Sequence, residues 1–269
     1  MSRAAEAVRG DRRVDLSRRD VGLVELMDDP ACDLDRLERT YAAFPLVNGV
    51  VAGWGRVYRE LLRPLLSAER TLRVLDVGSG GGDVARWLVR RARRDGLRLQ
   101  VVAVDPDERA HAWASRRPEP GVEYRCVSSG ELVAAGETFD VVISNHVLHH
   151  LDDEARESVL ADSERLADRL VVHSDIRRAR LAYLGYWLGS LVLDRRSFVR
   201  VDGLRSIRRS FRVDELRAVA PPGWRVVGRE PFRLWLLHET PAPGRGGAVS
   251  ESTAAGAPQA VRLPGGGRA

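Results

Sequence analysis

The stretch RVLDVGSGGGDVARWLV at residues 73–89 limits the folds open to this chain more than any other segment. An apolar run ends in a cluster of glycines at positions 78, 80, 81 and 82, and apolar residues with helical spacing follow at once. A strand, a glycine turn and a helix in this order form a cradle for a nucleotide-like ligand, because glycine lets the backbone turn tightly and approach the ligand. The stretch therefore predicts an α/β fold with a ligand site at this turn.

The chain beyond this stretch alternates between strand-like and helix-like segments. Apolar runs at 99–105, 122–127, 139–145 and 169–175 are expected strands, and helices are expected at 83–93, 108–115 and within 146–168. Asp83 is the expected N-cap of the first of these helices. Such alternation predicts a parallel sheet with helices on both faces. Two further strands around Pro231 should give the sheet an antiparallel end. Ligands of such folds bind beyond the carboxyl ends of the strands, so we expect the site residues there.

The composition of the ends and of one insert suggests how the chain is organised. Residues 1–20 are strongly charged and residues 241–269 are rich in Gly, Pro, Ala and Ser, so we expect two disordered tails. Residues 21–240 then form one domain with a helical cap at 21–70. An insert at 176–212, called the lid segment below, is expected to cover the strand ends. The alternative is a surface helical hairpin that forms a homodimer.

Composition also argues against several classes of protein. The N-terminus lacks the apolar core of a signal peptide, and the longest apolar run, at 181–193, is shorter than the roughly 20 residues of a membrane-spanning helix. Two cysteines do not make a disulfide framework, so a cytoplasmic location is expected. The lid segment holds ten arginines and two aspartates. Because these arginines are not interleaved with stacking aromatic residues, we expect no nucleic-acid partner.

Three motifs, taken in order, resemble the class I S-adenosylmethionine-dependent methyltransferases. The first motif of that family, Asp-x-Gly-x-Gly-x-Gly, stands here as Asp76, Gly78, Gly80 and Gly82, whereas a dinucleotide fingerprint would place glycine where Asp83 stands. The stretches VVAVDPD and FDVVISNHVLHHLDD are similar to later motifs of its small-molecule branch. The resemblance covers residues 72–239, and the stretches DIRRARLAY and VDGLRSIRRSF around the lid segment resemble actinobacterial methyltransferases of secondary-metabolite type. It implies a Rossmann-like fold with a seven-stranded, mostly parallel sheet, an antiparallel end and a helical N-terminal cap.

The resemblance also implies S-adenosylmethionine as the cofactor and S-adenosylhomocysteine as its product. Asp105 would take the ribose hydroxyls, and Asp76 would attract the ammonium group. The family often places Asp after the third strand to bind the adenine, but Ser128 stands here, with Glu131 close by. The cofactor-binding residues that we expect are Asp76, Gly78, Ser79, Gly80, Asp105, Pro106, Ser128, Ser129 and Asn145.

The reaction implied by the resemblance is methyl transfer to a small aromatic or polyketide-like acceptor, with O-methylation favoured. Such transfer depends on alignment more than on acid–base chemistry, but a phenol must still lose its proton. His149 and His173 are the candidate bases, and the alternative is that both are structural. His150 is expected to point into the core, and no metal is expected.

Four residues of or beside the lid segment are expected to contact the acceptor, namely Asp175, Arg178, Tyr183 and Trp187. Two alternative functions stay open. One is a lipid or quinone methyltransferase, favoured by the apolar run of the lid segment. The other is a non-catalytic S-adenosylmethionine-binding protein, which only a test for turnover separates from an enzyme.

Overall fold

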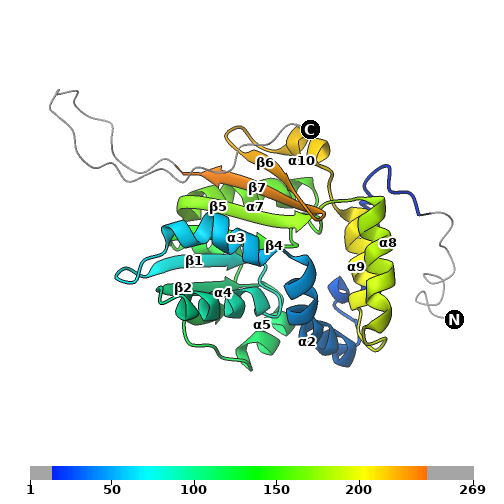
Figure 1. Cartoon of the computed structure of the whole chain (residues 1–269), viewed down its shortest axis with the longest axis horizontal. Coiled ribbons are helices and arrows are strands. Elements are labelled where there is room, and N and C mark those ends of the chain that lie inside the picture. Colours follow the sequence, from blue (N-terminus) through cyan, green and yellow to red (C-terminus); the bar gives the residue numbers. More distant parts are fainter. Residues whose placement is uncertain (1–13, 241–269) are drawn as a thin grey trace.

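Residues 14–240 are described by a computed structural model, in which seven strands form one sheet (Figure 1). The strand order is β3-β2-β1-β4-β5-β7-β6. The strands β1 to β5 pair in parallel, whereas β7 runs antiparallel to β5 and to β6. This confirms the predicted mostly parallel sheet with an antiparallel end. The strands are β1 Leu72–Val77, β2 Leu99–Val104, β3 Val122–Arg125, β4 Phe139–Asn145, β5 Ala167–Ile176, β6 Arg225–Arg229 and β7 Arg233–Glu239.

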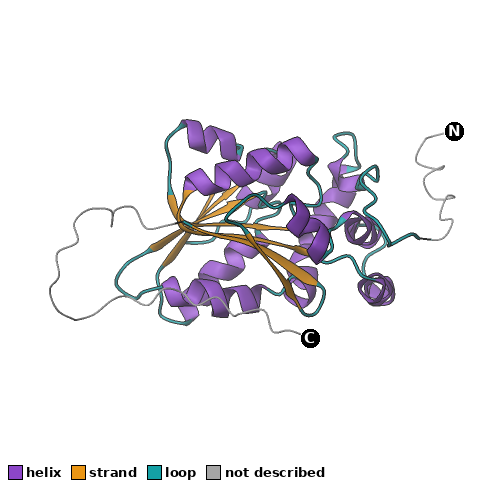
Figure 2. Ribbon diagram, turned by 90° about the horizontal axis from the view of Figure 1, so that it is seen from above, coloured by secondary structure: helices purple, strands orange, loops and turns teal. Residues whose placement is uncertain are grey.

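Helices cover both faces of the sheet, as the view along its edge shows (Figure 2). The helices between the strands are α4 Asp83–Arg94, α5 Glu108–Ser115, α6 Ser129–Ala134, α7 Asp153–Leu166 and α10 Val213–Val219. The N-terminal cap holds η1 Leu26–Asp28, α2 Leu34–Val51, α3 Trp54–Val57, η2 Tyr58–Leu62 and η3 Arg63–Leu65. The lid segment holds α8 Arg180–Gly189, η4 Ser190–Val192 and α9 Val199–Arg209. Within residues 14–240, no helix combines the length and apolar character that crossing a bilayer requires.

Side chains of the central strands alternate between two cores. Val74 packs in a cluster with α3, η2 and α4, while the next residue, Leu75, packs on the opposite face in a cluster with α6 and the end of α7. Because both faces are buried, the strands read as continuous apolar runs. A smaller cluster of Leu37, Tyr41 and Phe198 with two residues of α5 holds α2 beside the carboxyl ends of the strands. These contacts bring the N-terminal cap and the lid segment to the edge where a ligand is expected.

Local capping shifts several helix boundaries from their predicted positions. The N-cap of α4 is Gly82 in the left-handed conformation, so Asp83 is the first helical residue and not the cap as expected. Asp152 caps α7 by accepting from the backbone N–H of Ala155. This cap leaves the histidines at 146–150 in a turn before the helix, whereas the sequence pattern suggested that they begin it.

The segment at 14–20 lies against the domain, which corrects the predicted N-terminal tail for these residues. Leu16 is 7% exposed, and its carbonyl accepts hydrogen bonds from Arg178 and Arg212. Asp20 accepts from Arg208. The apolar Leu16 is isolated in a charged stretch, so sequence patterning gave no sign of this contact. The rest of the two predicted tails, residues 1–13 and 241–269, lies outside the described residues.

We expect a chain that begins at residue 21 to be less stable than one that begins at residue 14, with both ending at residue 240. The shorter chain lacks the Leu16 carbonyl, so buried guanidinium groups lose hydrogen-bond acceptors at a cost of about 1–3 kcal/mol. Thermal unfolding should show this as a lower midpoint, by about 2–4 °C for each kcal/mol. Equal midpoints would show that the contact contributes nothing to stability.

Candidate active site

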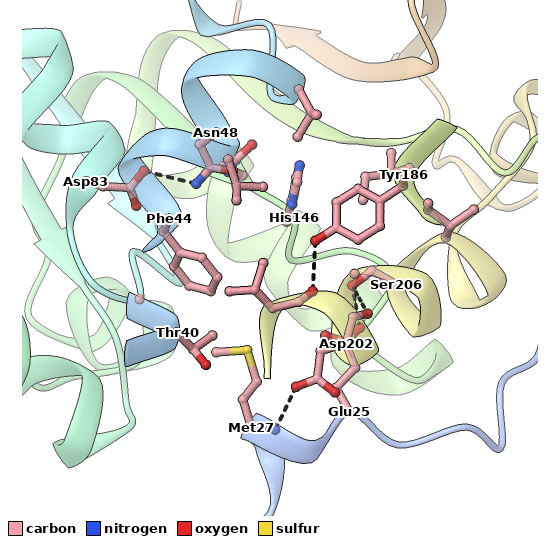
Figure 3. A pocket seen from close by; sticks show the side chains of 18 of the residues that line it. Glu25, Met27, Thr40, Phe44, Asn48, Asp83, His146, Tyr186, Asp202 and Ser206 are labelled. Atoms are coloured by element: carbon pink, nitrogen blue, oxygen red, sulfur yellow. Dashed lines mark hydrogen bonds between the residues drawn. The ribbon is translucent and has the colours of Figure 1, made fainter. Parts of the chain in front are cut away.

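A cavity of about 1020 Å³ lies beyond the carboxyl ends of β1, β2 and β4. Its other walls are η1, α2, α8 and α9, so the N-terminal cap and the lid segment enclose it together (Figure 3). The volume is at the upper end of the range for small-molecule sites. The cavity therefore has room for more than one small molecule.

The glycine turn forms one end of this cavity. Gly78 and Gly80 both have positive φ, of 66° and 51°. A Cβ on Gly78 would lie 2.7 Å from a methyl group of Val147, so the turn needs glycine there for space as well as for conformation. The N–H of Gly80 donates to Asp105 at 2.8 Å, and the N–H of Asp107 donates to the other oxygen of Asp105 at 2.9 Å. These bonds fix the Asp105 carboxylate at the cavity and leave it further lone pairs for a ligand.

Three carboxyl groups lie together below the turn, at Asp76, Asp83 and Asp105. Burial, and then the charges of the other two, raise the pKa of Asp76 well above its usual range. Burial also raises the pKa of Asp83 and of Asp105. One buried oxygen of Asp76 has no hydrogen-bond partner among the described residues. Such a site favours a positively charged ligand, because a cation offsets the cost of ionising buried carboxyl groups.

The cavity holds little positive charge to bind a phosphate. The sequence contains no lysine, and Arg233 is the only arginine among the described residues that line the cavity. Its guanidinium is engaged by Ser174, Asn145 and His146. The electrostatics therefore oppose the pyrophosphate of a dinucleotide.

Most of the predicted cofactor-binding residues line this cavity. They are Asp76, Gly78, Ser79, Gly80, Asp105, Pro106 and Asn145. Ser128 and Ser129 do not line it. Ser128 forms a capping box with Glu131 at the start of α6, and the hydroxyl of Ser129 donates to Asp162 at 2.7 Å. Asp107, the N-cap of α5, lines the cavity but was missed, although it is the last residue of the VVAVDPD motif.

The other end of the cavity has apolar walls. Phe44 and Val51 of α2 face Leu181 and Tyr186 of α8 across it. The hydroxyl of Tyr186 donates to the carbonyl of Val199 at 2.8 Å, which ties α8 to α9 (Figure 3). A Cβ on Gly203 would lie 2.3 Å from the tyrosine ring, so this glycine allows the close contact. This end resembles a binding compartment for an apolar molecule beside the charged cradle.

The four predicted acceptor contacts all lie outside the cavity lining. Trp187 is 42% exposed, and the helical turn of α8 directs it and Tyr183 away from the wall that Tyr186 forms. Asp175 and Arg178 are buried. The guanidinium of Arg178 donates to the carbonyls of Leu16 and Ser210 and pairs with Glu215, so it joins the N-terminal segment and the lid segment to the sheet.

His149 is buried between two carboxylates. Its Nδ1 lies 2.6 Å from an oxygen of Asp175, and its Nε2 lies 3.4 Å from an oxygen of Glu25. Burial opposes the charge, but the two carboxylates raise the pKa of His149 to about 9. A protonated imidazole cannot take a proton from a phenol, and His149 does not line the cavity. His150, which we expected in the core, lines the cavity instead.

His173 lies inside the sheet layer, away from the cavity lining. Its Nδ1 is 2.7 Å from the hydroxyl of Ser144, and its ring stacks on Trp224. Burial lowers the pKa of His173 to about 3. The structure thus brings neither predicted base to the cradle.

His146 is a cavity residue that sequence reasoning passed over. It directly follows β4, has a left-handed φ of 61°, and lies at the centre of the cavity view (Figure 3). Burial, and then the charge of Arg233, hold its pKa well below the usual range. Its Nε2 contacts the Arg233 guanidinium, so the neutral ring carries its proton on Nδ1. His146 therefore offers an N–H donor to a ligand and not a base.

The buried His173 should make stability depend on pH. Its pKa is lowered on folding, so between about pH 6.5 and pH 3 the unfolded chain binds the extra proton and stability falls with acid. The slope from this group is at most about 1.4 kcal/mol per pH unit. Urea unfolding at pH 7 and at pH 5 measures how much unfolding free energy is lost on acidification, and this loss should be smaller for His173→Gln than for the original chain. Equal losses in both proteins would contradict the buried neutral histidine.

Known proteins share this core. Residues 74–168 match the family model described as "Methyltransferase domain". Ubiquinone biosynthesis O-methyltransferases of Rhizobium rhizogenes and Rhizobium etli are each 40% identical over 88 residues, which is 30% of this chain and 32% of theirs. The chain thus matches about a third of the length of these relatives. The crystal structure of human N-acetylserotonin methyltransferase with S-adenosylmethionine has a TM-score of 0.54 at 12% identity, covering 88% of this chain and 65% of that one.

These likenesses agree with the sheet topology. The fold is the Rossmann-like fold of the class I methyltransferases, and the matched segment holds most of β1 and all of β2, β3 and β4, with the whole glycine turn. Residues 74–168, about a third of the chain, therefore resemble a methyltransferase domain. The motifs at residues 76–82, 101–107 and 139–153 predicted this resemblance.

Proposed function

We propose that this chain is an S-adenosylmethionine-dependent methyltransferase that methylates a hydroxyl oxygen of a small, largely apolar acceptor. The observation that carries the proposal is the cluster of three carboxyl groups under the glycine turn, in one cavity with an apolar compartment. A cationic cofactor fits the first part, and an apolar acceptor fits the second.

Residues of the cradle suit two polar parts of S-adenosylmethionine, its ammonium group and its ribose hydroxyls. The unpartnered oxygen of Asp76 suits the ammonium group of the cofactor, and the fixed carboxylate of Asp105 suits its ribose hydroxyls. The backbone of Gly78 and Gly80 allows close approach because neither carries a Cβ. When bound, the cofactor supplies an electrophilic methyl group on a sulfonium.

The contribution of the chain itself is to hold and align the acceptor. Tyr186 and Phe44 provide apolar surface, and the Nδ1–H of His146 can donate to an acceptor oxygen. The lid segment and the N-terminal cap form the walls of the cavity over the strand ends. Holding two reacting groups in this way can supply about 7–11 kcal/mol of a barrier. The acceptor can then react as a phenolate that has already given its hydroxyl proton to water, with no strong base beside the oxygen.

A hydroxylated aromatic ring is the acceptor class that these features favour. The apolar walls suit such a ring, and a quinone-type acceptor also agrees with the names of the relatives. The polyketide-like acceptor and the role in secondary metabolism stay predictions. The non-catalytic alternative would keep the cradle but show no turnover.

Kinetics of a matched pair of variants test the acceptor compartment. We expect Tyr186→Ala to raise KM for a hydroxylated aromatic acceptor by about tenfold, because the side chain is apolar surface used alike in the ground state and the transition state. Trp187→Ala, the adjacent residue on the outer face of α8, is the control and should leave KM unchanged. A larger effect from Trp187 would place the acceptor elsewhere, and binding of the cofactor without transfer to any acceptor would favour the non-catalytic alternative.

A further inference from the structure

Glu25, His149 and His150 form a cluster at the wall of the cavity. Oε1 of Glu25 lies 3.4 Å from Nε2 of His149 and 3.7 Å from Nε2 of His150. One ligand atom from each of the three residues falls within 4.8 Å of the others. Glu25 and His150 line the cavity, and Glu25 lies beside Asp202 and Ser206 at its base (Figure 3).

The distances in this cluster suit a bound ion better than hydrogen bonds. His149 is completely buried, yet its Nε2 has no hydrogen-bond partner among residues 14–240. Hydrogen bonds of this type span about 2.7–3.2 Å. Two ligand atoms on a tetrahedral zinc ion with bonds of about 2.0–2.1 Å lie about 3.3–3.4 Å apart. The separation of 3.4 Å between Glu25 and His149 agrees with that edge, whereas the 3.7 Å between Glu25 and His150 has to shorten when an ion binds.

Each histidine is oriented by a carboxylate on its other nitrogen. Nδ1 of His149 lies 2.6 Å from Asp175, and Nδ1 of His150 lies 2.9 Å from Asp28. A carboxylate on the far nitrogen is the usual support of a metal-binding histidine, because it fixes the ring and turns the Nε2 lone pair toward the ion. The same pattern on two adjacent histidines points to a built site.

Other contacts hold the cluster in place from behind. The guanidinium of Arg209 donates to the carbonyls of His149, His150 and Leu23, so it fixes the histidine turn and the segment before Glu25 together. The hydroxyl of Ser206 donates to Oε1 of Glu25 at 2.8 Å. These bonds hold the backbone of the histidine turn and the carboxylate of Glu25 in place before any ion binds.

We propose that Glu25, His149 and His150 bind a divalent ion of the zinc type, with the remaining coordination position facing the cavity. The ion takes the place of a proton on Nε2 of His149, and its charge offsets those of Glu25, Asp28 and Asp175. This site differs from the expectation that no metal is bound. If the proposed function holds, an acceptor hydroxyl bound to the ion would lose its proton more readily. Neither His149 nor His173 can take that proton by itself.

Direct measurement of zinc binding tests the site without any activity assay. The metal-stripped protein is dialysed against buffered Zn²⁺, and its metal content gives the number of ions bound per chain. Competition with a chelator then gives the affinity for zinc. We expect one ion per chain. His150→Ala should weaken binding by about 100-fold or more, and Asp28→Asn by about 10–100-fold through loss of ring orientation. His111→Ala on α5 is the matched control, because it removes a histidine outside the cavity lining and should bind as the original chain does.

Folding and cofactor binding are measured on the same proteins. His150 is only partly buried, so His150→Ala should fold even if a variant of the buried His149 does not. Loss of zinc with retained binding of S-adenosylhomocysteine supports the metal site and keeps the proposed function separate from it. The proposal would be overturned if the original chain bound no zinc, or if His150→Ala and Glu25→Gln bound zinc as tightly as the original chain does. His149 would then be a protonated imidazole between two carboxylates.

Discussion

Replacing Asp105 by alanine should weaken binding of S-adenosylhomocysteine by about 30- to 1000-fold, which corresponds to about 2–4 kcal/mol. The carboxylate is fixed at the cavity by the N–H groups of Gly80 and Asp107, so it is ready to accept from both ribose hydroxyls. The variant loses two charge-assisted hydrogen bonds and also releases the Gly80 turn. Isothermal calorimetry measures the affinity directly.

The control for this change is Glu108→Ala in the same segment. Glu108 begins α5 and is exposed, and it does not line the cavity, but its removal changes the net charge in the same way. Its affinity should stay within about twofold of the original chain. If Asp105→Ala also keeps the original affinity, Asp105 is not part of the cofactor site.

Replacing Arg209 by methionine should lower the free energy of unfolding by about 3–5 kcal/mol. Arg209 is 8% exposed, and its guanidinium donates to the carbonyls of His149, His150 and Leu23. Methionine keeps much of the volume but leaves these groups without their donor, and the N-terminal segment loses a connection to the histidine turn. Urea unfolding in the presence of a chelator measures the change without any contribution from bound metal.

Arg196→Met is the matched control for that variant. Arg196 lies on the exposed loop between η4 and α9, where an arginine contributes little to stability, so the change should stay within about 0.5 kcal/mol. A loss below 1 kcal/mol in Arg209→Met would show that water replaces the lost donor and that Arg209 does not hold the site together.

The sheet and the cradle could be predicted because both follow from short-range patterns. A continuous apolar run marks a strand that is buried on both faces, and a glycine cluster after the run marks the turn at its carboxyl end. Asp76 and Asp105 were predicted as site residues for this reason, since the topology brings successive strand ends to one edge. Ser128 follows the same rule, but the capping box with Glu131 uses its hydroxyl in α6.

The acceptor side could not be predicted because it depends on contacts between distant segments. Tyr186 and Trp187 are adjacent in one aromatic run, and only the rotation of α8 against Gly203 decides which of them faces the cavity. The state of His149 depends on Glu25, which the N-terminal cap brings from far away in the sequence. The contact of Leu16 could not be predicted for a similar reason, because its carbonyl accepts hydrogen bonds from Arg178 and Arg212 of the distant lid segment.

The measurement that tests this account most directly is calorimetric titration of the original chain with S-adenosylmethionine and, separately, with NAD⁺. Both ligands suit a glycine turn after a strand, but only the first lacks phosphate and carries a net positive charge. The buried carboxyl groups of Asp76, Asp83 and Asp105 predict one molecule of S-adenosylmethionine per chain, displaced by S-adenosylhomocysteine, and no binding of NAD⁺. Binding of NAD⁺ without binding of S-adenosylmethionine would contradict the account.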